Sequence, residues 1–430
     1  MVTRSTTIWG RFTEGAFIWG ALLCLSLAPT TWGERRASAA GAQASWAGAW
    51  PMVGHDPQRT NRSASVGPLH PRLLFTDHSL IRPVLIGPDG SLYASSYDQS
   101  TRVGGLAALT ATGQRRWSVA LSAGEGGPPT LAPDGSVLVN ANDGTGEVIA
   151  AVAPSGQRTW TIRSLPWTVG LHETPHSKGE PPLVTADGSL YVPLVGPEFK
   201  RGDNVGLQVV SPVGTPLRVL QRGIIPYAVA VASDGTVYEL AARCCTGPVS
   251  LMALNPTGAP LWTRSLGFAP TFDSSGLLVG ASGTIYASDG AGIGTGQANE
   301  VVAYTPSGRR LWRARTSDGA ATLAERPDGV VLVATATSLM ALRPNGMQVW
   351  RRALGRRAGT GAVQLHLPSL AVDAAGRVYV GSSDGVVRAL GPDGVQLWTL
   401  GHPNPLGTPS VALGPQGQLA VASDALRVYR

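Results

Sequence analysis

Charged residues are scarce in this chain, and lysine is almost missing. Only 14% of the 430 residues are charged, and Lys178 and Lys200 are the two lysines. No helical periodicity continues beyond the first thirty residues, whereas glycine (55) and proline (33) are plentiful. This composition excludes long amphipathic helices and favours many short strands joined by turns.

Cysteine is also rare, which excludes a scaffold held together by several disulfides. The chain has three cysteines, Cys24, Cys244 and Cys245, and none forms a C-x-x-C-H haem attachment sequence. The glycine-rich run 290–296 is not followed by a helical pattern that would supply a phosphate site. No nucleophile elbow appears in a strand–turn–helix context. The sequence therefore carries no common catalytic motif.

The first forty residues have the pattern of an export signal. Arg4 and Arg11 precede an apolar run at 16–28, and Ala37-Ser38-Ala39 provides small residues for cleavage. The apolar run is shorter than the roughly 20 residues that span a bilayer. We predict a signal peptide over residues 1–40 and an exported protein, which is extracellular, periplasmic or on the cell surface. A retained signal anchor is the alternative, and it would be the protein's only membrane contact.

One sequence motif recurs along the chain. It consists of a short apolar run, a turn that ends in glycine, and a tryptophan four residues after that glycine. Asn345-Gly346 is typical of tight hairpin turns, so each copy predicts two antiparallel strands. Each indole is expected to fill the wedge between neighbouring sheets. The third copy keeps Gly214 but has Arg218 in place of tryptophan, so its packing should differ. The six structural tryptophans are Trp117, Trp160, Trp262, Trp312, Trp350 and Trp398.

A second hairpin precedes each tryptophan motif, so one repeat contains four strands, A to D. Trp117 and Trp398 lie six repeats apart, which gives about 47 residues per repeat, as in a propeller blade. The last repeat lacks its fourth strand, and residues 71–76 are the candidate to complete it. The sequence predicts an all-β, eight-bladed propeller of four-stranded antiparallel blades, closed by this amino-terminal strand; seven blades is the alternative. We expect an extended lead-in at 41–70 and one propeller domain at 71–430.

The lengths of the connections predict where a binding site lies. The A–B and C–D turns are short, and they share one face of an up-and-down propeller. The long connections all join B to C or D to A, so they should gather on the opposite face, where binding sites tend to be placed. They cover residues 164–181, 194–205, 241–249, 288–299 and 355–367.

One of these connections contains a match to the zinc-protease pattern H-E-x-x-H. The pattern requires a helix that places both imidazoles on one face, with the glutamate activating water. Pro175 lies between Glu173 and His176 and disfavours that helix. We therefore judge His172, Glu173 and His176 a false match and predict no metal site and no catalytic residue.

Cys244 and Cys245 are adjacent in another long connection. Their Cα atoms are about 3.8 Å apart by chain geometry, below the roughly 4.4–6.8 Å of ordinary disulfides. Two interpretations remain open. The first is a strained disulfide that faces a ligand. The second has no ligand and consists of either two partly buried thiols or a disulfide that acts as a local staple. With Arg243, these cysteines are the candidate cofactor-binding residues.

Arginines near the repeat tryptophans account for much of the formal charge of +7. Examples are Arg115, Arg116, Arg310, Arg351 and Arg352. Charges on exposed outer strands deter edge-to-edge pairing. A nucleic-acid site would need basic and aromatic residues interleaved on one surface. We therefore expect no nucleic-acid partner.

The phrase Ala-Leu-x-Pro-x-Gly-x-x-x-Trp, at 341–350 and 389–398, resembles the pyrroloquinoline-quinone-like (PQQ-like) propeller repeat family. The segment 50–60 resembles the lead-in of such exported proteins. The family includes quinone- and calcium-dependent alcohol dehydrogenases, some with a disulfide between adjacent cysteines over the quinone, which Cys244-Cys245 resembles. It also includes non-catalytic scaffolds of the BamB type. The chain lacks the Asp-x-x-Thr-Gly spacing of the dehydrogenases, and no Glu–Asn–Asp calcium set matches.

These observations together favour a non-catalytic binding or scaffold module that uses its long-connection face. A protein partner or envelope component, a monomeric state and no cofactor are expected. The enzyme alternative is a dehydrogenase with pyrroloquinoline quinone and calcium. The second alternative is cell-wall or polysaccharide binding, for which Trp167 and Phe199 are the candidate aromatic residues.

Overall fold

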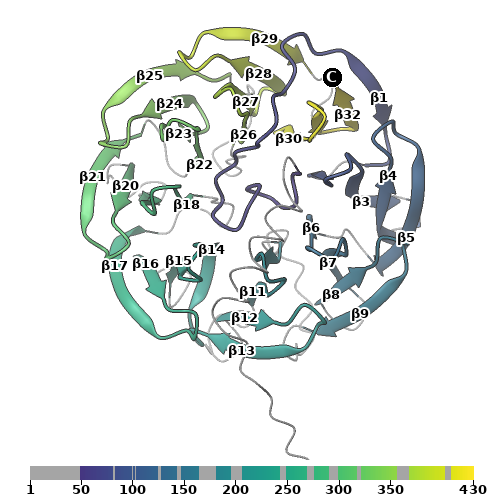
Figure 1. Cartoon of the computed structure of the whole chain (residues 1–430), viewed down its shortest axis with the longest axis horizontal. Coiled ribbons are helices and arrows are strands. Elements are labelled where there is room, and N and C mark those ends of the chain that lie inside the picture. The colour runs from purple at the N-terminus through teal and green to yellow at the C-terminus, as the bar shows by residue number, and fades with distance from the viewer. Residues whose placement is uncertain are drawn as a thin grey trace, which may run out of the picture.

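The computed structural model describes residues 49–80, 83–98, 100–101, 103–123, 127–142, 147–163, 181–194, 206–242, 248–268, 276–289, 299–316, 321–355, 368–401 and 408–430. Its strands form eight four-stranded antiparallel sheets arranged as a ring (Figure 1). The predicted eight-bladed β-propeller is confirmed, and the seven-bladed alternative is wrong. No helix in the described part of the chain is long and apolar enough to cross a membrane.

Each blade begins with a strand at the ring centre and ends with a strand on the outer wall. The strands of blades 1 to 4 are β2 (Leu85–Ile86), β3 (Leu92–Asp98), β4 (Val103–Leu109) and β5 (Arg115–Ala123); β6 (Pro129–Leu131), β7 (Val137–Asn142), β8 (Glu147–Val152) and β9 (Arg158–Arg163); β10 (Leu183–Val184), β11 (Leu190–Leu194), β12 (Gly206–Val210) and β13 (Pro216–Leu220); β14 (Ile225–Val231), β15 (Val237–Ala242), β16 (Pro248–Leu254) and β17 (Pro260–Phe268).

Blades 5 to 8 follow the same plan. Their strands are β18 (Leu277–Val279), β19 (Ile285–Asp289), β20 (Glu300–Tyr304) and β21 (Arg310–Arg315); β22 (Thr322–Glu325), β23 (Val331–Ala334), β24 (Ser338–Leu342) and β25 (Gln348–Ala353); β26 (Ser369–Val372), β27 (Val378–Gly381), β28 (Val386–Leu390) and β29 (Gln396–Gly401); β30 (Ser410–Leu413), β31 (Leu419–Ala422), β32 (Leu426–Tyr429) and β1 (Leu73–Asp77).

Blade 8 joins the two ends of the described chain. Strand β1 pairs antiparallel with β32, from Leu73 opposite Tyr429 to Asp77 opposite Leu426. The backbone groups of Arg72 and Arg430 extend this pairing with hydrogen bonds of 2.8 and 2.9 Å. The ring therefore closes through β-sheet hydrogen bonds between segments more than 300 residues apart, as the sequence predicted.

The C–D turns consist of a β-turn followed by a glycine with positive φ. In blade 6 the Gly346 N–H donates to the Arg343 carbonyl at 2.8 Å, and the pairing shifts by one residue beside the turn. Gly346 has φ 85°, whereas Asn345 does not have a positive φ. Asn345 instead accepts the Met347 N–H through its side-chain oxygen at 3.1 Å. A turn with one bulged glycine thus replaces the two-residue turn that Asn-Gly suggested.

Each repeat tryptophan packs against the next blade. In blades 1, 2, 4, 5 and 6 the indole covers the C–D turn glycine of the next blade, so closely that a Cβ on Gly346 or Gly394 would lie 2.8 or 2.6 Å from the ring of Trp312 or Trp350. The indole N–H also donates to the turn proline, from Trp312 to the Pro344 carbonyl at 2.7 Å. Trp117, Trp262, Trp350 and Trp398 make the corresponding bonds to the carbonyls of Pro154, Pro306, Pro392 and Pro68.

Blade 3 replaces the missing tryptophan with two side chains. The Arg218 guanidinium donates to the Pro256 carbonyl at 2.6 Å, which is the bond that an indole makes elsewhere. Leu220 covers the turn glycine, Gly258, where a Cβ would lie 2.5 Å from its Cδ2. In blade 8, Phe75 covers Gly113 of blade 1 in the same way. The packing of blade 3 differs as predicted, but the hydrogen bond to the next blade is kept.

The contact between indole and glycine predicts a large difference between two glycines of blade 7. Gly394→Ala should lower the free energy of unfolding by about 2–5 kcal/mol, because alanine must adopt φ 77° and contact Trp350. Gly401→Ala is the matched control, since a Cβ there meets nothing within 4 Å. The control should be neutral or stabilising by up to about 1 kcal/mol. Urea unfolding followed by tryptophan fluorescence measures both, and equal effects would contradict the proposed role of the contact.

Candidate functional site

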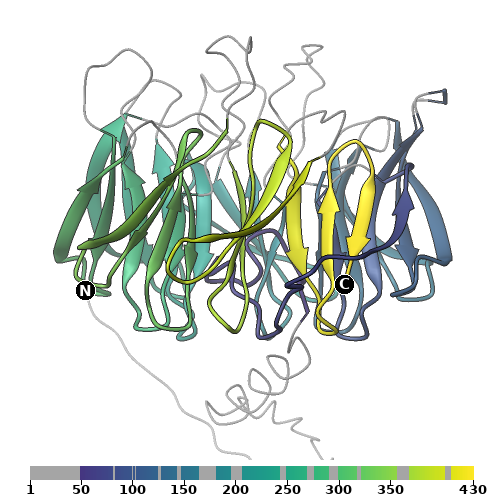
Figure 2. The same ribbon diagram turned by 90° about the horizontal axis from the view of Figure 1, so that it is seen from above.

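The lead-in segment, residues 50–68, lies at the centre of the ring and closes one end of it (Figure 2). Six blades donate the N–H of the last inner-strand residue to a lead-in carbonyl, at 2.7–3.0 Å. The A–B turns follow these residues directly, so the lead-in closes the end of the ring that carries the short turns. The six pairs, donor first, are Ile86 to Trp50, Leu131 to Pro51, Val231 to Pro57, Val279 to Gln58, Glu325 to Thr60 and Val372 to Asn61.

Side chains of the lead-in hold its curved path in place. Arg59 and Asn61 have positive φ values of 61° and 51°, which are costly for residues other than glycine. The Arg59 Nε donates to the Val229 carbonyl at 2.7 Å, and the Asn61 Nδ2 donates to the Leu323 carbonyl at 2.8 Å. Since both residues are buried, these bonds also satisfy polar groups that water does not reach.

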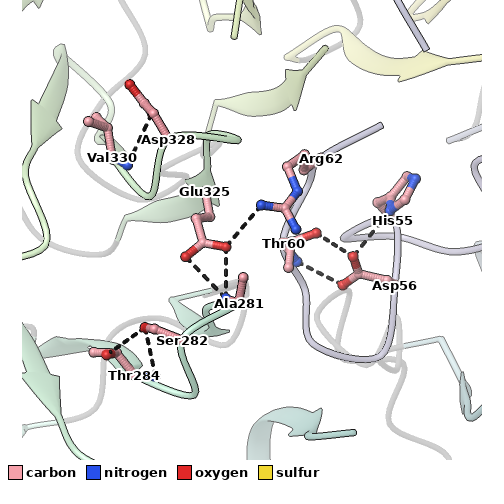
Figure 3. A network of polar contacts seen from close by, with 10 residues as sticks. All are labelled: His55, Asp56, Thr60, Arg62, Ala281, Ser282, Thr284, Glu325, Asp328 and Val330. Carbon is pink, nitrogen blue, oxygen red and sulfur yellow. Dashed lines mark hydrogen bonds and ion pairs between the residues drawn. The ribbon is translucent and has the colours of Figure 1, made fainter. Parts of the chain in front are cut away.

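A polar network connects the lead-in with blades 5 and 6 (Figure 3). Asp56 accepts the Thr60 N–H at 2.9 Å and also the Thr60 hydroxyl. Arg62 lies 3.3 Å from the Glu325 carboxylate, which also accepts the Ala281 N–H at 2.9 Å. Burial raises the pKa of Glu325, and the bonds from Ala281 and Arg62 oppose that shift. Glu325 is thus a buried carboxyl group whose oxygens have partners.

Asp373 anchors the end of the lead-in to blade 7. Its side chain is fully buried and accepts hydrogen bonds from the Gly67 N–H, the Arg377 Nε and the Tyr379 hydroxyl. Arg377 in turn donates to the Gly67 carbonyl at 2.9 Å. This ion pair is therefore well supplied with hydrogen bonds, as a buried pair must be.

Glu239 is the second buried glutamate, and its environment differs from that of Glu325. It lies in the middle of β15 and is 1% exposed. No described residue forms a hydrogen bond with its buried Oε1. Its directly paired neighbours are Val229 and Met252, which offer no charge to it. Burial alone raises the pKa of Glu239 to about 7.

Comparison of the eight blades shows how unusual Glu239 is. The same position of the second strand is alanine or valine in every other blade. Those seven residues are Ala94, Val139, Val192, Ala287, Val333, Val380 and Val421. Because the ring forms with an apolar residue at this position elsewhere, the fold does not require a carboxyl group there. A buried carboxyl with a free oxygen can accept a hydrogen bond or a cation, or exchange a proton near neutral pH.

The predicted cofactor-binding residues lie directly beyond this strand. β15 ends at Ala242, and Arg243, Cys244 and Cys245 follow it. These three residues are outside the described part of the chain, as are His172, Glu173 and His176 of the zinc-type match. Most of each long connection is also outside it. The strand ends that flank these connections all lie at the end of the ring opposite the short turns.

Within the described ranges, no group of three or more histidine, cysteine, aspartate or glutamate side chains could hold a metal ion. Sequence reasoning missed both Glu239 and the closure of the ring by the lead-in. An alignment of the eight repeats would have singled out Glu239.

The position of Glu239 predicts a pH-dependent stability. A pKa of about 7 in the folded state and 4.5 in the unfolded state means that the folded protein holds a proton which unfolding releases. The contribution of this proton to the free energy of unfolding is complete below about pH 4.5 and is lost as the pH rises through about 7. In Glu239→Gln the free energy of unfolding should not show this decrease, which is on the order of 3 kcal/mol.

Urea unfolding of the wild type and Glu239→Gln between pH 4.5 and 8 tests this. The two curves should diverge as the pH rises, with the variant the more stable at pH 8. Glu239→Val, which restores the residue type of the other blades, should behave like the glutamine variant. Curves that run parallel over this range would show that the carboxyl group is already ionised or has a partner.

Comparisons with known proteins agree with this architecture. Among solved structures, the Dos1 propeller covers 84% of this chain and 95% of its own at 12% identity, with a TM-score of 0.58. BamB from Moraxella catarrhalis covers 84% and 99% at 17% identity with a TM-score of 0.37, and a streptogramin B lyase covers 70% and 92% at 13% identity with a TM-score of 0.46. The likeness to the Dos1 propeller concerns the fold alone, and the other two carry no argument. No curated protein matches the chain by sequence.

One family matches more than half of the chain. Its description is "Outer membrane protein assembly factor BamB", and it matches residues 87–195 and 297–429. The first range covers blade 1 and blade 2 and reaches into blade 3, and the second runs from blade 5 to blade 8. The chain therefore belongs to the BamB-like family of PQQ-like β-propellers.

Proposed function

We propose that this protein is an exported, non-catalytic binding module that holds a protein partner of the cell envelope on its long-connection face. The observation that carries the proposal is the difference between the two ends of the ring. Short turns and the lead-in segment occupy one end, and the lead-in carbonyls already accept hydrogen bonds from six inner strands. The long connections leave and enter at the other end, which is the end free to vary without disturbing the blades.

The family supports a protein partner. The name of the matched family describes an assembly factor of outer-membrane proteins. We infer that this chain binds an envelope protein in a comparable way, with the blades as a rigid frame and the connections as the contact. Export follows in this proposal from the predicted signal peptide at 1–40.

Site-specific photo-crosslinking in the source cell tests the proposed face. A photoreactive phenylalanine analogue replaces Trp167 or Phe199 in the long connections, or Val213 or Val395 in the C–D turns. The turn positions are the matched controls, because these two side chains are exposed on the opposite end. We expect one envelope protein crosslinked from the connection positions and none from the turns. The same partner captured only from turn positions, or no specific partner from any position, would contradict the proposal.

The proposal also includes the absence of a quinone cofactor. Purified protein mixed with pyrroloquinoline quinone and Ca²⁺ should retain no quinone absorbance after desalting and should reduce no dye with simple alcohols. The repeats lack the Asp-x-x-Thr-Gly spacing of the dehydrogenases, and no Glu–Asn–Asp calcium set matches in the sequence, which is the reason for this expectation. Retained quinone with alcohol-dependent dye reduction would identify a dehydrogenase instead. Loss of that retention in a Cys244→Ser, Cys245→Ser variant would then place the quinone at the cysteine pair.

A further inference from the structure

The outer wall of the propeller has one sign of charge. The seven outer strands from β5 to β29 contain eleven arginines and no aspartate, glutamate or lysine. Only β1 of blade 8 adds an acidic residue, Asp77. Each of these strands is hydrogen-bonded on one side only, so its other edge faces outward. The wall is thus a curved basic surface.

Aliphatic side chains alternate with these arginines. The residue before the tryptophan position is an exposed leucine or valine in five consecutive blades, 3 to 7, with 40–55% of its surface exposed. The five residues are Leu217, Leu261, Leu311, Val349 and Leu397. Exposed leucine and valine at one repeated position form a band of apolar groups between the charges.

The largest group of arginines on two neighbouring blades lies on blades 5 and 6. β21 and β25 carry five of the eleven, Arg310, Arg313, Arg315, Arg351 and Arg352, and all five are exposed. We call the outer faces of these two strands the basic wall. The turns beside it add exposed Arg309 and Arg343 and the apolar Met347. Strands β5 and β9 carry two arginines each, and both arginines of β5 have a carboxylate partner, Asp77 for Arg115 and Asp89 for Arg116. Strands β13 and β17 carry one arginine each, and β29 carries none.

Few acidic groups neutralise the basic wall. Glu300 lies 3.6 Å from Arg313, and Asp289 interacts electrostatically with Arg310 and Arg313. Arg352 donates to the Gly394 carbonyl of blade 7 at 2.8 Å and so has a structural role. No described carboxylate forms an ion pair with Arg309, Arg315, Arg343 or Arg351. The wall therefore retains a net positive charge next to exposed leucine, valine and methionine.

Protection of sheet edges does not explain this distribution. Charges are one of several devices that prevent edge-to-edge pairing, so an open edge does not need many of them. Strand β29 is such an edge, has exposed Leu397, and carries no charge. The excess on β21 and β25 therefore calls for another explanation.

We propose that the basic wall binds the surface of a bilayer that contains anionic lipids. A plane can touch a ring from the side over only one or two blades, and blades 5 and 6 carry the largest group of arginines without a described carboxylate partner. Arginines contact the lipid phosphates, while Leu311, Val349 and Met347 enter the headgroup region. An anionic polymer without apolar groups would bind through the arginines alone, and the aliphatic side chains would remain exposed to water. The combination of the two residue types therefore favours a lipid surface.

Vesicle co-sedimentation of the purified protein tests this proposal. Vesicles of neutral phosphatidylcholine are compared with vesicles that contain 30% phosphatidylglycerol, at low and high salt. We expect binding to the anionic vesicles only, weakened by salt. Arg310→Gln, Arg315→Gln and Arg351→Gln together should reduce the affinity roughly 100-fold, because each basic residue at such a surface contributes roughly fivefold.

The matched control removes three arginines from the other side of the ring. Arg115→Gln, Arg116→Gln and Arg158→Gln change the net charge equally and should alter the affinity by less than about twofold. Leu311→Ser with Val349→Ser should weaken binding, whereas Leu217→Ser with Leu261→Ser should not. All variants share the same amino-terminal segment, so any insertion of residues 16–28 into the bilayer contributes equally to the measured vesicle binding of each variant. Circular dichroism and thermal melting confirm that each variant is folded.

Three results would overturn the proposal. The first is no binding to anionic vesicles at low salt. The second is an equal loss of vesicle affinity in both triple arginine-to-glutamine variants, which would show a nonspecific response to net charge. The third is equal binding to heparin or polyglutamate with no effect of the aliphatic variants, which would assign the wall to an acidic polymer or protein.

Discussion

The contact between an aromatic ring and a glycine of the next blade holds the ring of blades together. It requires a glycine, because the turn has a positive φ and a Cβ would lie within 2.8 Å of the Trp312 ring. It also requires a donor, since the turn carbonyl of Pro344 would otherwise lose its hydrogen bond. Blade 3 shows that the two requirements are separable: Leu220 covers the glycine and Arg218 supplies the donor. The repeat thus conserves a contact and a bond rather than one residue type.

The lead-in segment meets a second requirement of the ring. Inner strands that converge on an axis end in N–H groups that need acceptors, and unpaired buried groups are costly. The lead-in supplies six carbonyls for six blades, and Asp373 fixes its end through Gly67. Backbone atoms therefore fill the short-turn end of the axis. A site for a partner is consequently expected at the other end, where the connections are long.

The sequence predicted the repeated parts well because they follow simple patterns. The glycine-to-tryptophan spacing, the alternating apolar strands and the missing fourth strand led to eight blades closed by β1. The lead-in could not be predicted in this way. It acts through backbone carbonyls, which every residue has, and residues such as Arg59 and Asn61 adopt positive φ only because blades 4 and 6 accept their side-chain bonds. Glu239 was missed because its strand still reads as apolar.

Differences between blades are the best guide to function in a fold made of near-identical units. A property that all eight blades share is explained by the ring, whereas a costly property of one blade is not. Glu239 replaces alanine or valine and leaves a buried oxygen without a described partner, so we expect blade 4 to lose stability as the pH rises through about 7. The strand that carries it ends at Ala242, and Arg243 and the cysteine pair follow in the sequence. Since the other seven blades form without this carboxyl group, the architecture of the ring does not explain Glu239.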